Sequence, residues 1–454
     1  MQASLFPNEH GLGLLTDLYE LTMAAGYHTH GMADERATFE LWVRKLPESR
    51  NYLVAAGLEQ AVHYLTHLSF SAEQIDYLRG LPTFERVPAG WFDRLAKFRF
   101  DGDLWAIPEG TVVFAGEPLL RVTAPMMAAQ IVETYLITTI TMQTLVASKA
   151  ARITTAAQGR AVVDFGSRRA HGPQAGLLAA RAAYIGGCSG TSNTEAARIL
   201  GIPPLGTQAH SWVMAFGNEI EAFRAFGETF PSASTMLIDT FDTLQGARNA
   251  LAAAAPLQAV RLDSGDLAEL SKGVRKILDD GGRHDVQIFA SGDLNEFRIR
   301  QLLANGSPID AFGVGTDLVT SRDDPSLNTV YKLVEQDTPE GPIGRFKLSQ
   351  GKKTYPYAKQ VYRKMSDHGL FESDLIAREN EKHHGEALLI PILKNGQLLN
   401  PLPALATCQA RFAQQRRRLP PELQDLEKAA PYPVTVSDHL EKELERLAKA
   451  RLQN

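Results

Sequence analysis

Cysteine is scarce in this sequence, and its scarcity excludes two classes of structure. Only Cys188 and Cys408 are present. Two thiols are too few for a disulfide scaffold or for a zinc site built from cysteines alone, so we expect a reducing compartment. The first residues, MQASLFPNEHGLG, also lack the charged start and long apolar core of a signal peptide. We therefore expect a cytoplasmic location.

A surplus of positive charge and a long hydrophobic run are also missing. The chain has 47 Lys and Arg against 52 Asp and Glu, which gives a net charge of −5. Because binding to nucleic acid or to an anionic membrane needs a positive field, we expect neither as a partner. The longest apolar stretch, Met126 to Ala151, contains Glu133 and Lys149, so it is typical of a buried helix and not of a membrane span.

The commonest nucleotide-binding motifs are absent as well. The chain contains neither GxxxxGK[ST] nor a complete GxGxxG. A nucleotide, if one binds, is therefore held by other groups. No obvious lysine ends any of the strands expected below, which weakens the case for a lyase or aldolase that works through a Schiff base.

Residues 1–122 predict an α/β domain without a catalytic cluster of its own. A helix is expected to begin at Thr16 or Asp17, either of which can cap it, and to place Tyr19 in its first turn. Tyr19 then either faces a ligand or packs in a core or dimer contact. The other elements expected here are a strand over residues 37–47, a helix over 50–68 and hairpin strands within 102–114 and 116–124.

Residues 123–345 predict a barrel-like α/β domain. From residue 161 the chain repeats a short buried strand, a polar or glycine-rich turn and a helical stretch. The expected strands are AVVDF, the residues just before GTQAH, TMLID, AVRLD, QIFAS and AFGVG. The ends of the last four are 24, 28 and 24 residues apart, which suits the βα units of a parallel sheet or barrel. Residues 346–454 predict a mixed C-terminal region that ends in an amphipathic helix.

A polar cluster follows each of these strands. Residues that follow parallel strands meet at one edge of the sheet, where ligands bind. Carboxylates beside arginines and glycine amides suit a phosphorylated sugar together with a hard cation. The residues expected at this edge are Arg168, Arg169, His171, His210, Asp239, Asp242, Arg261, Asp263, Asp266, Ser291, Gly292, Asp293, Gly315 and Thr316.

Two features of this edge each have two interpretations. The turn GVGT, ending in Gly315 and Thr316, is either a simple tight turn or a phosphate cradle at the start of a helix. His210, in GTQAHSW, is either a structural histidine or a general base or nucleophile toward phosphorus. In the second case Asp239 or Asp242 is the candidate that orients its ring.

Six motifs, in this order, resemble one known family. They are TDLYELTMAAGY, FGSRRAHGP, GTQAHSW, LIDTFDT, VRLDSGDL and FGVGTD, and the match runs from about Thr16 to Arg363. Their order and spacing are similar to those of nicotinate phosphoribosyltransferases, which are related to nicotinamide phosphoribosyltransferases. The resemblance implies the type II phosphoribosyltransferase fold: an N-terminal α/β domain, an irregular α/β barrel and a C-terminal extension. It also implies a homodimer with shared active sites.

The resemblance further implies the reaction. Nicotinate and phosphoribosyl pyrophosphate give nicotinate mononucleotide and pyrophosphate in NAD biosynthesis, coupled to the hydrolysis of ATP to ADP and phosphate. ATP is then a co-substrate and Mg²⁺ a cofactor. The histidine that the family phosphorylates corresponds to His210, which we expect to act with Arg261 and Asp263, and Asp263 is the expected metal ligand.

Further substrate contacts follow from matching the motifs. The family's nicotinate contacts correspond to Tyr19, supplied across the dimer, and to Thr207 and Arg261, and its phosphate contacts correspond to Gly315 and Thr316. The edge residues Ser291, Gly292 and Asp293 are also expected to contact substrate.

Similarity to the nicotinamide-using relatives adds three residues. It implies that Phe165 stacks on the pyridine ring and that Arg168 lies beside it. Those relatives have an aspartate where this chain has Ser192, and a serine leaves no carboxylate to repel that of nicotinate.

One departure and two alternatives remain at this point. Family members usually have glycine after the proline of TYPYAKQVYR, where this chain has Tyr357; the departure bears on the conformation of that loop and not on the chemistry. The alternatives are a nicotinamide phosphoribosyltransferase on the same fold and a noncatalytic phosphoribosyl or nucleotide sensor.

Overall fold

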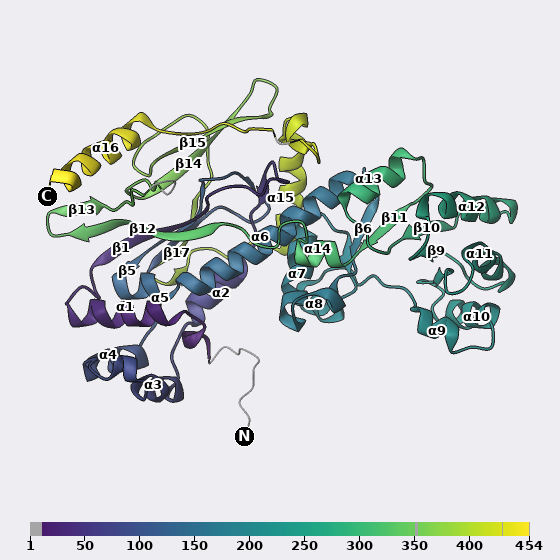
Figure 1. Cartoon of the computed structure of the whole chain (residues 1–454), viewed down its shortest axis with the longest axis horizontal. Coiled ribbons are helices and arrows are strands. Elements are labelled where there is room, and N and C mark those ends of the chain that lie inside the picture. The colour runs from purple at the N-terminus through teal and green to yellow at the C-terminus, as the bar shows by residue number, and fades with distance from the viewer. Residues whose placement is uncertain (1–10, 350–352, 429, 454) are drawn as a thin grey trace. The chain divides into compact units, whose positions relative to one another are not determined.

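The computed structural model describes residues 11–349, 353–428 and 430–453 (Figure 1). The chain divides into two compact units. Unit 1 comprises Met1–Thr144, Ser326–Asp425 and Ala429–Asn454, and unit 2 comprises Leu145–Pro325 and Leu426–Lys428. The domain boundaries expected from the sequence at residues 122 and 345 stay predictions.

Unit 1 is organised around an antiparallel sheet with the strand order β13-β12-β1-β5-β3-β17-β18. The strands are β1 (Arg36–Val43), β3 (Asp103–Ala106), β5 (Pro118–Pro125), β12 (Thr329–Thr338), β13 (Gly341–Gly344), β17 (Ile390–Lys394) and β18 (Gln397–Leu398). All residues of β1 after Arg36 are buried, so both of its faces are covered. The strand expected over residues 37–47 is confirmed as far as Val43, where β1 ends, and the antiparallel pairing of β3 with β5 is confirmed as well.

A short two-stranded ladder corrects one expectation. β2 (Leu53–Val54) pairs with β4 (Val112–Val113), so the prediction of one helix over residues 50–68 is wrong at its start. Helix α2 (Leu58–His67) begins only after Gly57, which has a φ of +102°. A Cβ at Gly57 would lie 2.8 Å from the carbonyl oxygen of Thr139. The chain therefore turns at a position that only glycine fills without strain, and the helix starts beyond it.

The helices of unit 1 include the one expected at Thr16 or Asp17. Helix α1 (Leu18–Thr29) has Asp17 as its N-cap residue and packs against α5 (Met126–Ile131). The long helix expected from Met126 is interrupted at Val132, after which α6 (Glu133–Ala156) continues into unit 2. No described helix, α6 included, is both long and apolar enough to cross a membrane. The other helices of unit 1 are α3 (Ala72–Arg79), α4 (Ala89–Ala96), α15 (Leu405–Arg418) and α16 (Asp438–Gln453), with 3-10 turns η1 (Leu12–Leu14), η2 (Pro82–Phe84) and η4 (Pro421–Gln424).

A second sheet, with the order β16-β14-β15-β19, carries the C-terminal part of unit 1. Its strands are β14 (Lys359–Met365), β15 (Phe371–Arg378), β16 (Glu386–Ala387) and β19 (Val434–Val436). Just before β14, Tyr357 has a φ of +66°, in the left-handed region. Glycine adopts this region at no cost, which explains why glycine is expected at this position. The buried ring of Tyr357 lies 3.9 Å from Cζ of Arg378.

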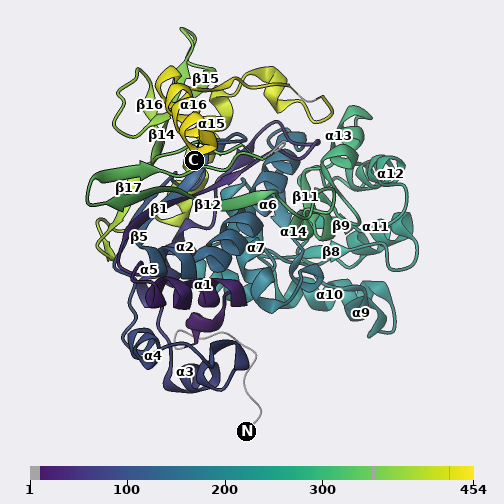
Figure 2. The same ribbon diagram turned by 60° about the vertical axis from the view of Figure 1, so that its left-hand side comes forward.

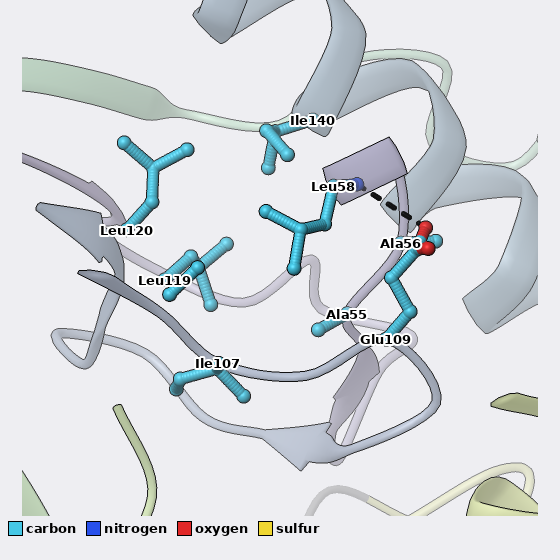
Figure 3. Close-up of a pocket in the computed structure, with 9 residues that line it drawn as sticks. Ala55, Ala56, Leu58, Ile107, Glu109, Leu119, Leu120 and Ile140 are labelled. Carbon is cyan, nitrogen blue, oxygen red and sulfur yellow. Dashed lines mark hydrogen bonds between the residues drawn. The ribbon is translucent and has the colours of Figure 1, made fainter. Parts of the chain in front are cut away.

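A small pocket of unit 1 has a mainly apolar lining (Figure 3). The residues around it are Ala55, Ala56, Leu58, Ala106, Ile107, Glu109, Leu119, Leu120 and Ile140. Oε1 of Glu109 accepts hydrogen bonds from the N–H groups of Gly57 and Leu58, at 2.6 and 3.2 Å. These bonds satisfy the start of α2, so this lining provides a helix cap and not a set of catalytic groups.

Unit 2 is built on six parallel strands with helices between them. The order is β7-β6-β11-β10-β9-β8, and every neighbouring pair is parallel. Helices α10, α11 and α12 lie outside this curled sheet in both views (Figure 1 and Figure 2). The expected combination of an N-terminal α/β domain, a barrel-like α/β part and a C-terminal region is thus confirmed.

The bounds of the elements of unit 2 are as follows. The strands are β6 (Ala161–Asp164), β7 (Gly190–Thr191), β8 (Thr235–Leu237), β9 (Ala259–Leu262), β10 (Gln287–Ala290) and β11 (Ala311–Val314). The helices are α7 (Pro173–Ile185), α8 (Thr194–Leu200), α9 (His210–Met214), α10 (Glu219–Thr229), α11 (Thr243–Ala252), α12 (Leu267–Asp280), α13 (Glu296–Ala304) and α14 (Thr316–Thr320), with a 3-10 turn η3 (Ser167–Arg169).

Five of the six strands expected in this region are confirmed, but the strand expected just before GTQAH is wrong. The residues there form only an isolated bridge, between Pro204 and Thr191. Pro203 and Pro204 have no N–H group to donate to a ladder, which prevents a regular strand. At this side the sheet instead ends with β7, whose last residue is Thr191.

Candidate active site

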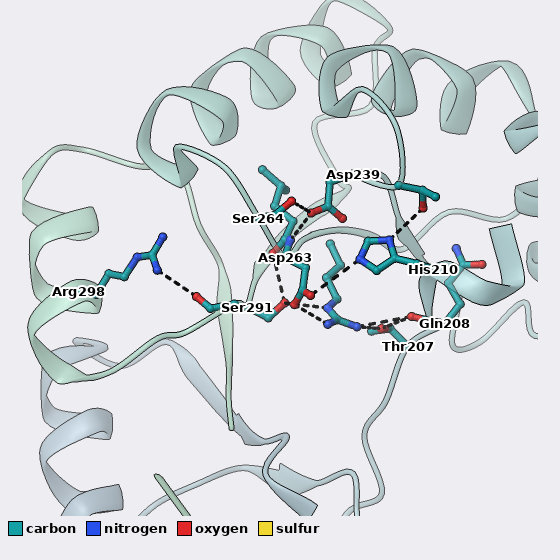
Figure 4. Close-up of polar contacts among 12 residues, drawn as sticks. Thr207, Gln208, His210, Asp239, Asp263, Ser264, Ser291 and Arg298 are labelled. Atoms are coloured by element: carbon teal, nitrogen blue, oxygen red, sulfur yellow. Dashed lines mark hydrogen bonds and ion pairs between the residues drawn. The ribbon is translucent and has the colours of Figure 1, made fainter. Parts of the chain in front are cut away.

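The carboxyl ends of β8, β9 and β10 and the start of α9 form one polar cluster (Figure 4). Asp239, Asp263 and Ser291 follow the three strands, and His210 is the first residue of α9. Because these strands are parallel neighbours, their carboxyl ends lie at the same edge of the sheet. The structure therefore brings together four of the residues that the sequence predicted for this edge.

Arg261, in β9, connects the loops of this cluster. It donates hydrogen bonds from Nε to Oγ of Ser291 at 2.8 Å, from Nη1 to Oγ1 of Thr207 at 2.7 Å and from Nη2 to Oδ1 of Asp263 at 2.6 Å. Only 8% of the residue is exposed. A buried guanidinium that uses all three nitrogens has little freedom, so Arg261 fixes the positions of its neighbours.

Ser291 holds the other side of Asp263. Its hydroxyl lies 2.5 Å from Oδ1 of Asp263, and because the guanidinium of Arg261 can only donate, Ser291 directs its proton to that carboxylate. Burial raises the pKa of Asp263, but the hydrogen bond from Ser291 and the charge of Arg261 outweigh burial and lower the pKa below its usual value. Asp263 is therefore ionised at neutral pH.

His210 lies between a hydroxyl and a carboxylate. Its Nδ1 is 3.1 Å from Oγ1 of Thr240, and its Nε2 is 3.9 Å from Oδ2 of Asp263. The side chain is 41% exposed, so a ligand can reach the ring. An imidazole held at one nitrogen and accessible at the other can act as a base or as a nucleophile.

The expectation that Asp239 or Asp242 orients His210 is wrong. Oδ2 of Asp239 accepts the N–H of Asp263 at 2.9 Å, and Asp242 is the N-cap of α11. Both carboxylates are thus used by backbone N–H groups, to which an ionised acceptor binds strongly. Thr240, between them in the chain, contacts the ring instead.

Phe165 follows β6 and packs among aromatic and cationic groups. Its ring centroid is 5.4 Å from that of Phe289, with 26° between the planes, and 5.3 Å from Cζ of Arg261. Gly313 leaves space for the ring, because a Cβ there would lie 2.5 Å from it. The structure thus fixes an aromatic ring beside Arg261.

The turn after β10 presents backbone to the same edge. Gly292 and Asp293 have φ values of +88° and +47°. A Cβ at Gly292 would lie 1.8 Å from the carbonyl oxygen of Asp263, so only glycine fits there. Arg298 donates from Nη1 to the carbonyl oxygen of Gly292 at 3.3 Å (Figure 4). A turn of this shape exposes N–H groups that suit an anion.

Four predicted residues lie at carboxyl ends of the sheet without joining the Arg261 cluster. Arg168 and Ser192 follow β6 and β7 and are exposed, whereas Gly315 and Thr316 begin α14 and are half-buried. The helix expected to follow Thr316 is confirmed, although it is only five residues long. In the described part of the chain, no hydrogen bond connects these four residues to Arg261, Asp263 or His210.

Tyr19 belongs to unit 1 and lies in the first turn of α1, as expected, with 47% of its surface exposed. Burial raises the pKa of Tyr19, and the neighbouring carboxylates of Glu133 and Glu20 raise it further. The phenol therefore keeps its proton at neutral pH. A protonated phenol can donate a hydrogen bond to an acceptor such as a carboxylate.

Sequence reasoning missed two residues of this cluster, Thr240 and Gln208. Thr240 follows β8 just as Asp239 does, so the rule used for the other strands could have found it. Gln208 accepts a hydrogen bond from Arg261 at its backbone carbonyl, at 3.5 Å, and its buried amide nitrogen is 3.6 Å from the sulfur of Met236. No pattern in GTQAHSW indicates that Gln208 points inward.

The same cluster contains the candidate metal ligands. Among the described residues, no group of three or more His, Cys, Asp or Glu could hold a metal ion. Oδ1 of Asp239, however, is buried and receives no hydrogen bond from a described residue, and Oδ2 of Asp263 lies outside the Arg261 network. Mg²⁺ commonly takes one or two carboxylates together with waters and substrate phosphates, so this pair fits Mg²⁺ and not a structural zinc site.

Three family models match the chain. The N-terminal domain of nicotinate phosphoribosyltransferase matches residues 14–141, the nicotinate phosphoribosyltransferase family matches residues 160–337, and the C-terminal domain matches residues 382–444. Among solved structures, that of human nicotinic acid phosphoribosyltransferase aligns with a TM-score of 0.83 at 28% identity, over 96% of this chain and 100% of that one. This match confirms the expected fold.

Curated relatives agree with the family models. The chain is 47% identical to nicotinate phosphoribosyltransferase pncB2 of Mycobacterium tuberculosis, over 97% of this chain and 95% of that protein. It is 41% identical to nicotinate phosphoribosyltransferase of Bacillus subtilis, over 82% of this chain and 78% of the relative. The chain therefore belongs to the nicotinate phosphoribosyltransferase family of enzymes.

Proposed function

We propose that this chain transfers the phosphoribosyl group of phosphoribosyl pyrophosphate to nicotinate and couples the transfer to ATP hydrolysis. The products are nicotinate mononucleotide, pyrophosphate, ADP and phosphate, and the reaction serves NAD biosynthesis. One observation carries the proposal: in a member of this family, Thr207, Arg261, Asp263 and His210 are linked by successive contacts of 2.7, 2.6 and 3.9 Å. These contacts connect Thr207, a proposed nicotinate contact, to His210, the proposed nucleophile.

His210 is the proposed phosphoacceptor. With its Nδ1–H donated to Thr240, its Nε2 carries the lone pair. Nε2 attacks the γ-phosphorus of ATP, so that an N–P bond forms while the P–O bond to ADP breaks and ADP leaves with the electron pair. The ring becomes positively charged in this step, and the ionised carboxylate of Asp263 stabilises that charge. Water later breaks the N–P bond and releases phosphate.

Mg²⁺ is the proposed cofactor, held by Asp263 and Asp239 with the phosphates of the substrates. Two oxygen atoms support this role. Oδ1 of Asp239 is buried and accepts no hydrogen bond from a described residue, and Oδ2 of Asp263 accepts none from Arg261, which binds Oδ1 instead. When bound there, Mg²⁺ would neutralise the negative charge that develops on the departing pyrophosphate.

The pyridine is held by side chains near the ends of β6 and β9. Phe165 stacks on the ring, and the hydroxyl of Thr207 and the guanidinium of Arg261 bind the carboxylate. The pyridine nitrogen attacks the anomeric carbon while the bond from that carbon to the pyrophosphate oxygen breaks. The pyrophosphate leaves with the electron pair, and Arg168 lies beside the pyridine ring.

The phosphate groups of the sugar are held by backbone at the same edge. Gly315 and Thr316 offer N–H groups at the start of α14, and Gly292 and Asp293, in the turn after Ser291, offer more. Ser192 adds no charge to the site, so the carboxylate of nicotinate is not repelled there.

The proposed assembly is a homodimer in which Tyr19 of one subunit completes the site of the other. The support for it is the exposed apolar surface at the start of α1, where Leu15, Leu18 and Tyr19 are 37%, 51% and 47% exposed. A cluster of exposed large side chains of this kind is typical of a contact surface.

Replacing His210 with alanine tests the phosphoryl step. His210→Ala is expected to reduce ATP hydrolysis by at least about a hundredfold, because the nucleophile is gone, while slow ATP-independent transfer remains. The measurement is pyrophosphate release from phosphoribosyl pyrophosphate and nicotinate, with and without ATP. It is accompanied by mapping of the acid-labile phosphoryl group after incubation with γ-labelled ATP.

The matched control is His284→Ala, which removes an exposed histidine of the same unit that pairs with Asp279. It should keep both activities and the label. Label on another residue, or full ATP-coupled turnover in His210→Ala, would show that the assignment is wrong. Equal use of nicotinamide and nicotinate would overturn the choice of substrate, and no pyrophosphate release with either would favour a noncatalytic sensor.

A further inference from the structure

Asp164, the last residue of β6, is completely buried and uses both of its carboxylate oxygens. Oδ1 accepts the N–H of Gly166 at 2.8 Å, and Oδ2 accepts the hydroxyl of Thr191 at 2.7 Å. Thr191 is the last residue of the neighbouring strand β7. One carboxylate therefore binds the loop that follows β6 and the end of β7 at the same time.

The residues that directly follow β6 and β7 are the ones proposed to face the pyridine. Phe165 follows Asp164, and Ser192 follows Thr191. The N–H of Ser192 donates to the backbone carbonyl of Asp164 at 2.8 Å, and the N–H of Asn193 donates to Oγ1 of Thr191 at 3.0 Å. The positions of Phe165 and Ser192 are thus tied together through Asp164.

The ladder between β6 and β7 is too short to give this rigidity alone. β7 has two residues at the edge of the sheet, and its paired residues are Gly190 with Val163 and Thr191 with Asp164. So short a strand makes few ladder hydrogen bonds, and on its outer side the backbone of Thr191 makes two more, donating to the carbonyl oxygen of Pro203 at 3.1 Å and accepting from the N–H of Leu205 at 2.9 Å. The side-chain bond from Thr191 adds a contact that the ladder lacks.

The loop after β6 is also confined from its other side. A Cβ at Gly166 would lie 2.0 Å from a methyl group of Val319 in α14, so the backbone passes close to that helix. The N–H of Phe165 donates to the carbonyl oxygen of Val314 at 2.9 Å. The loop therefore has little freedom apart from its bond to Asp164. A shift of the Asp164 carboxylate would move the loop and with it the ring of Phe165.

We propose that Asp164 and Thr191 are positioning residues that set the separation between Phe165 and Ser192 and thereby the fit of the pyridine substrate. The inference rests on the proposed function, because it takes Phe165 and Ser192 as walls of the nicotinate site. Neither Asp164 nor Thr191 contacts the reacting atoms. Their effect is therefore on binding of the pyridine and not on the departure of pyrophosphate.

Thr191→Val tests this role, because valine keeps the shape of threonine and removes the hydroxyl. The KM for nicotinate is expected to rise about tenfold, the factor that corresponds to the loss of about 1.4 kcal/mol of binding. The KM for phosphoribosyl pyrophosphate and the kcat should stay within about twofold of the wild type, since uniform binding of one substrate is lost. Thr191→Ser, which keeps the hydroxyl, is the matched control and should behave like the wild type.

A second variant covers the case in which Thr191→Val does not fold. Asp164→Asn keeps the size of the side chain but replaces one acceptor with a donor, so it should raise the KM for nicotinate with little change in kcat. An unchanged KM for nicotinate in a folded variant, or an equal rise in both KM values, would overturn the proposal. The wild type is assayed first: if it releases no pyrophosphate from the two substrates, the proposed function itself fails, whatever the variants do.

Discussion

Tyr357 holds a backbone conformation that its residue type disfavours. Its φ of +66° costs an L residue about 1–2 kcal/mol relative to a right-handed conformation. Its N–H donates to the carbonyl oxygen of Val334 at 2.7 Å, and its own carbonyl accepts from Nζ of Lys359 at 2.8 Å. The buried ring also packs against Arg378. These contacts offset the conformational cost. The left-handed conformation is therefore imposed by the loop and is not one that the tyrosine side chain favours.

Replacing Tyr357 with alanine and with glycine should separate these contributions. Both variants lose the ring and are expected to be less stable than the wild type. Tyr357→Gly should nevertheless be more stable than Tyr357→Ala by about 1 kcal/mol, because only alanine keeps the strained Cβ. Urea denaturation gives the free energies of unfolding. At the exposed Tyr77, inside α3, the same two changes should give the ordinary order, with alanine the more stable, and the same order at both positions would contradict the explanation.

Single residues of the site differ in how far the sequence reveals them. Asp263 and Ser291 could be predicted to lie at one edge because each follows a strand, and parallel strands end together. What each side chain contacts depends on the turn that carries it, which is why Thr240 and not Asp239 was found beside His210. Aspartate adopts a left-handed φ more readily than most residues, but the residue type alone does not show that Asp293 does so.

At the scale of elements, helix α13 is attached to α6 by buried charges. Glu296, the first residue of α13, is 2.8 Å from Nε of Arg152 and 2.7 Å from Nζ of Lys149. Lys149 is also 2.9 Å from Asp323. Burial raises the pKa of Glu296, but the charge of Lys149 and the hydrogen bonds outweigh burial and lower it. The ionised form of Glu296 is therefore the one that the fold stabilises.

Glu296→Gln should destabilise the protein at neutral pH by about 3 kcal/mol, because Lys149 and Arg152 keep their charges in a buried place and lose a carboxylate. A lowered pKa in the folded state means that this stabilisation is present above the unfolded value, near about 4.3, and is lost as the pH falls through the folded value. The difference in unfolding free energy between wild type and variant should therefore shrink below about pH 4. Urea denaturation between pH 3 and pH 7 measures this difference.

The control for this prediction is an exposed ion pair of the same unit. Lys276 and Asp280 lie 2.7 Å apart, with 75% and 64% of their side chains exposed. Asp280→Asn should change the unfolding free energy little, since solvent screens such pairs. An equally small effect of Glu296→Gln would mean that the buried charges do not stabilise α13.

Elements could be predicted where their pattern is local. The strands that end at Asp164 and Val314 are short apolar runs followed by polar turns, and the structure confirms them. Strand β7 has no such run, since Gly190 and Thr191 alone form it, and its existence depends on pairing with β6. The residues before GTQAH were expected in a strand, but their two prolines prevent one.

At the scale of the whole molecule, the order of the chain conceals which segments pair. β1 pairs antiparallel with β12, so Leu41 lies opposite Tyr331, far away in the sequence. Alternation of apolar residues indicates that a segment is a strand but not which strand is its partner. The sequence therefore predicts the fold class and the edge at which the polar side chains gather more readily than the connection between the first and last parts of unit 1.

Mixing two variants that are each expected to lose ATP-coupled transfer tests the proposed homodimer and its shared sites. In a dimer with Tyr19 of one subunit in the site of the other, a Tyr19→Ala subunit paired with a His210→Ala subunit has one site with both residues intact and one with neither. After subunit exchange at equal concentrations, random pairing makes half of the dimers mixed. Each mixed dimer has one active site of two, so about a quarter of the wild-type ATP-coupled activity should return, as expected for two-fold symmetric contacts.

If each site is instead complete within one subunit, both sites of a mixed dimer carry one substitution and mixing restores nothing. A wild-type protein that remains monomeric at the assay concentration would reject the dimer itself.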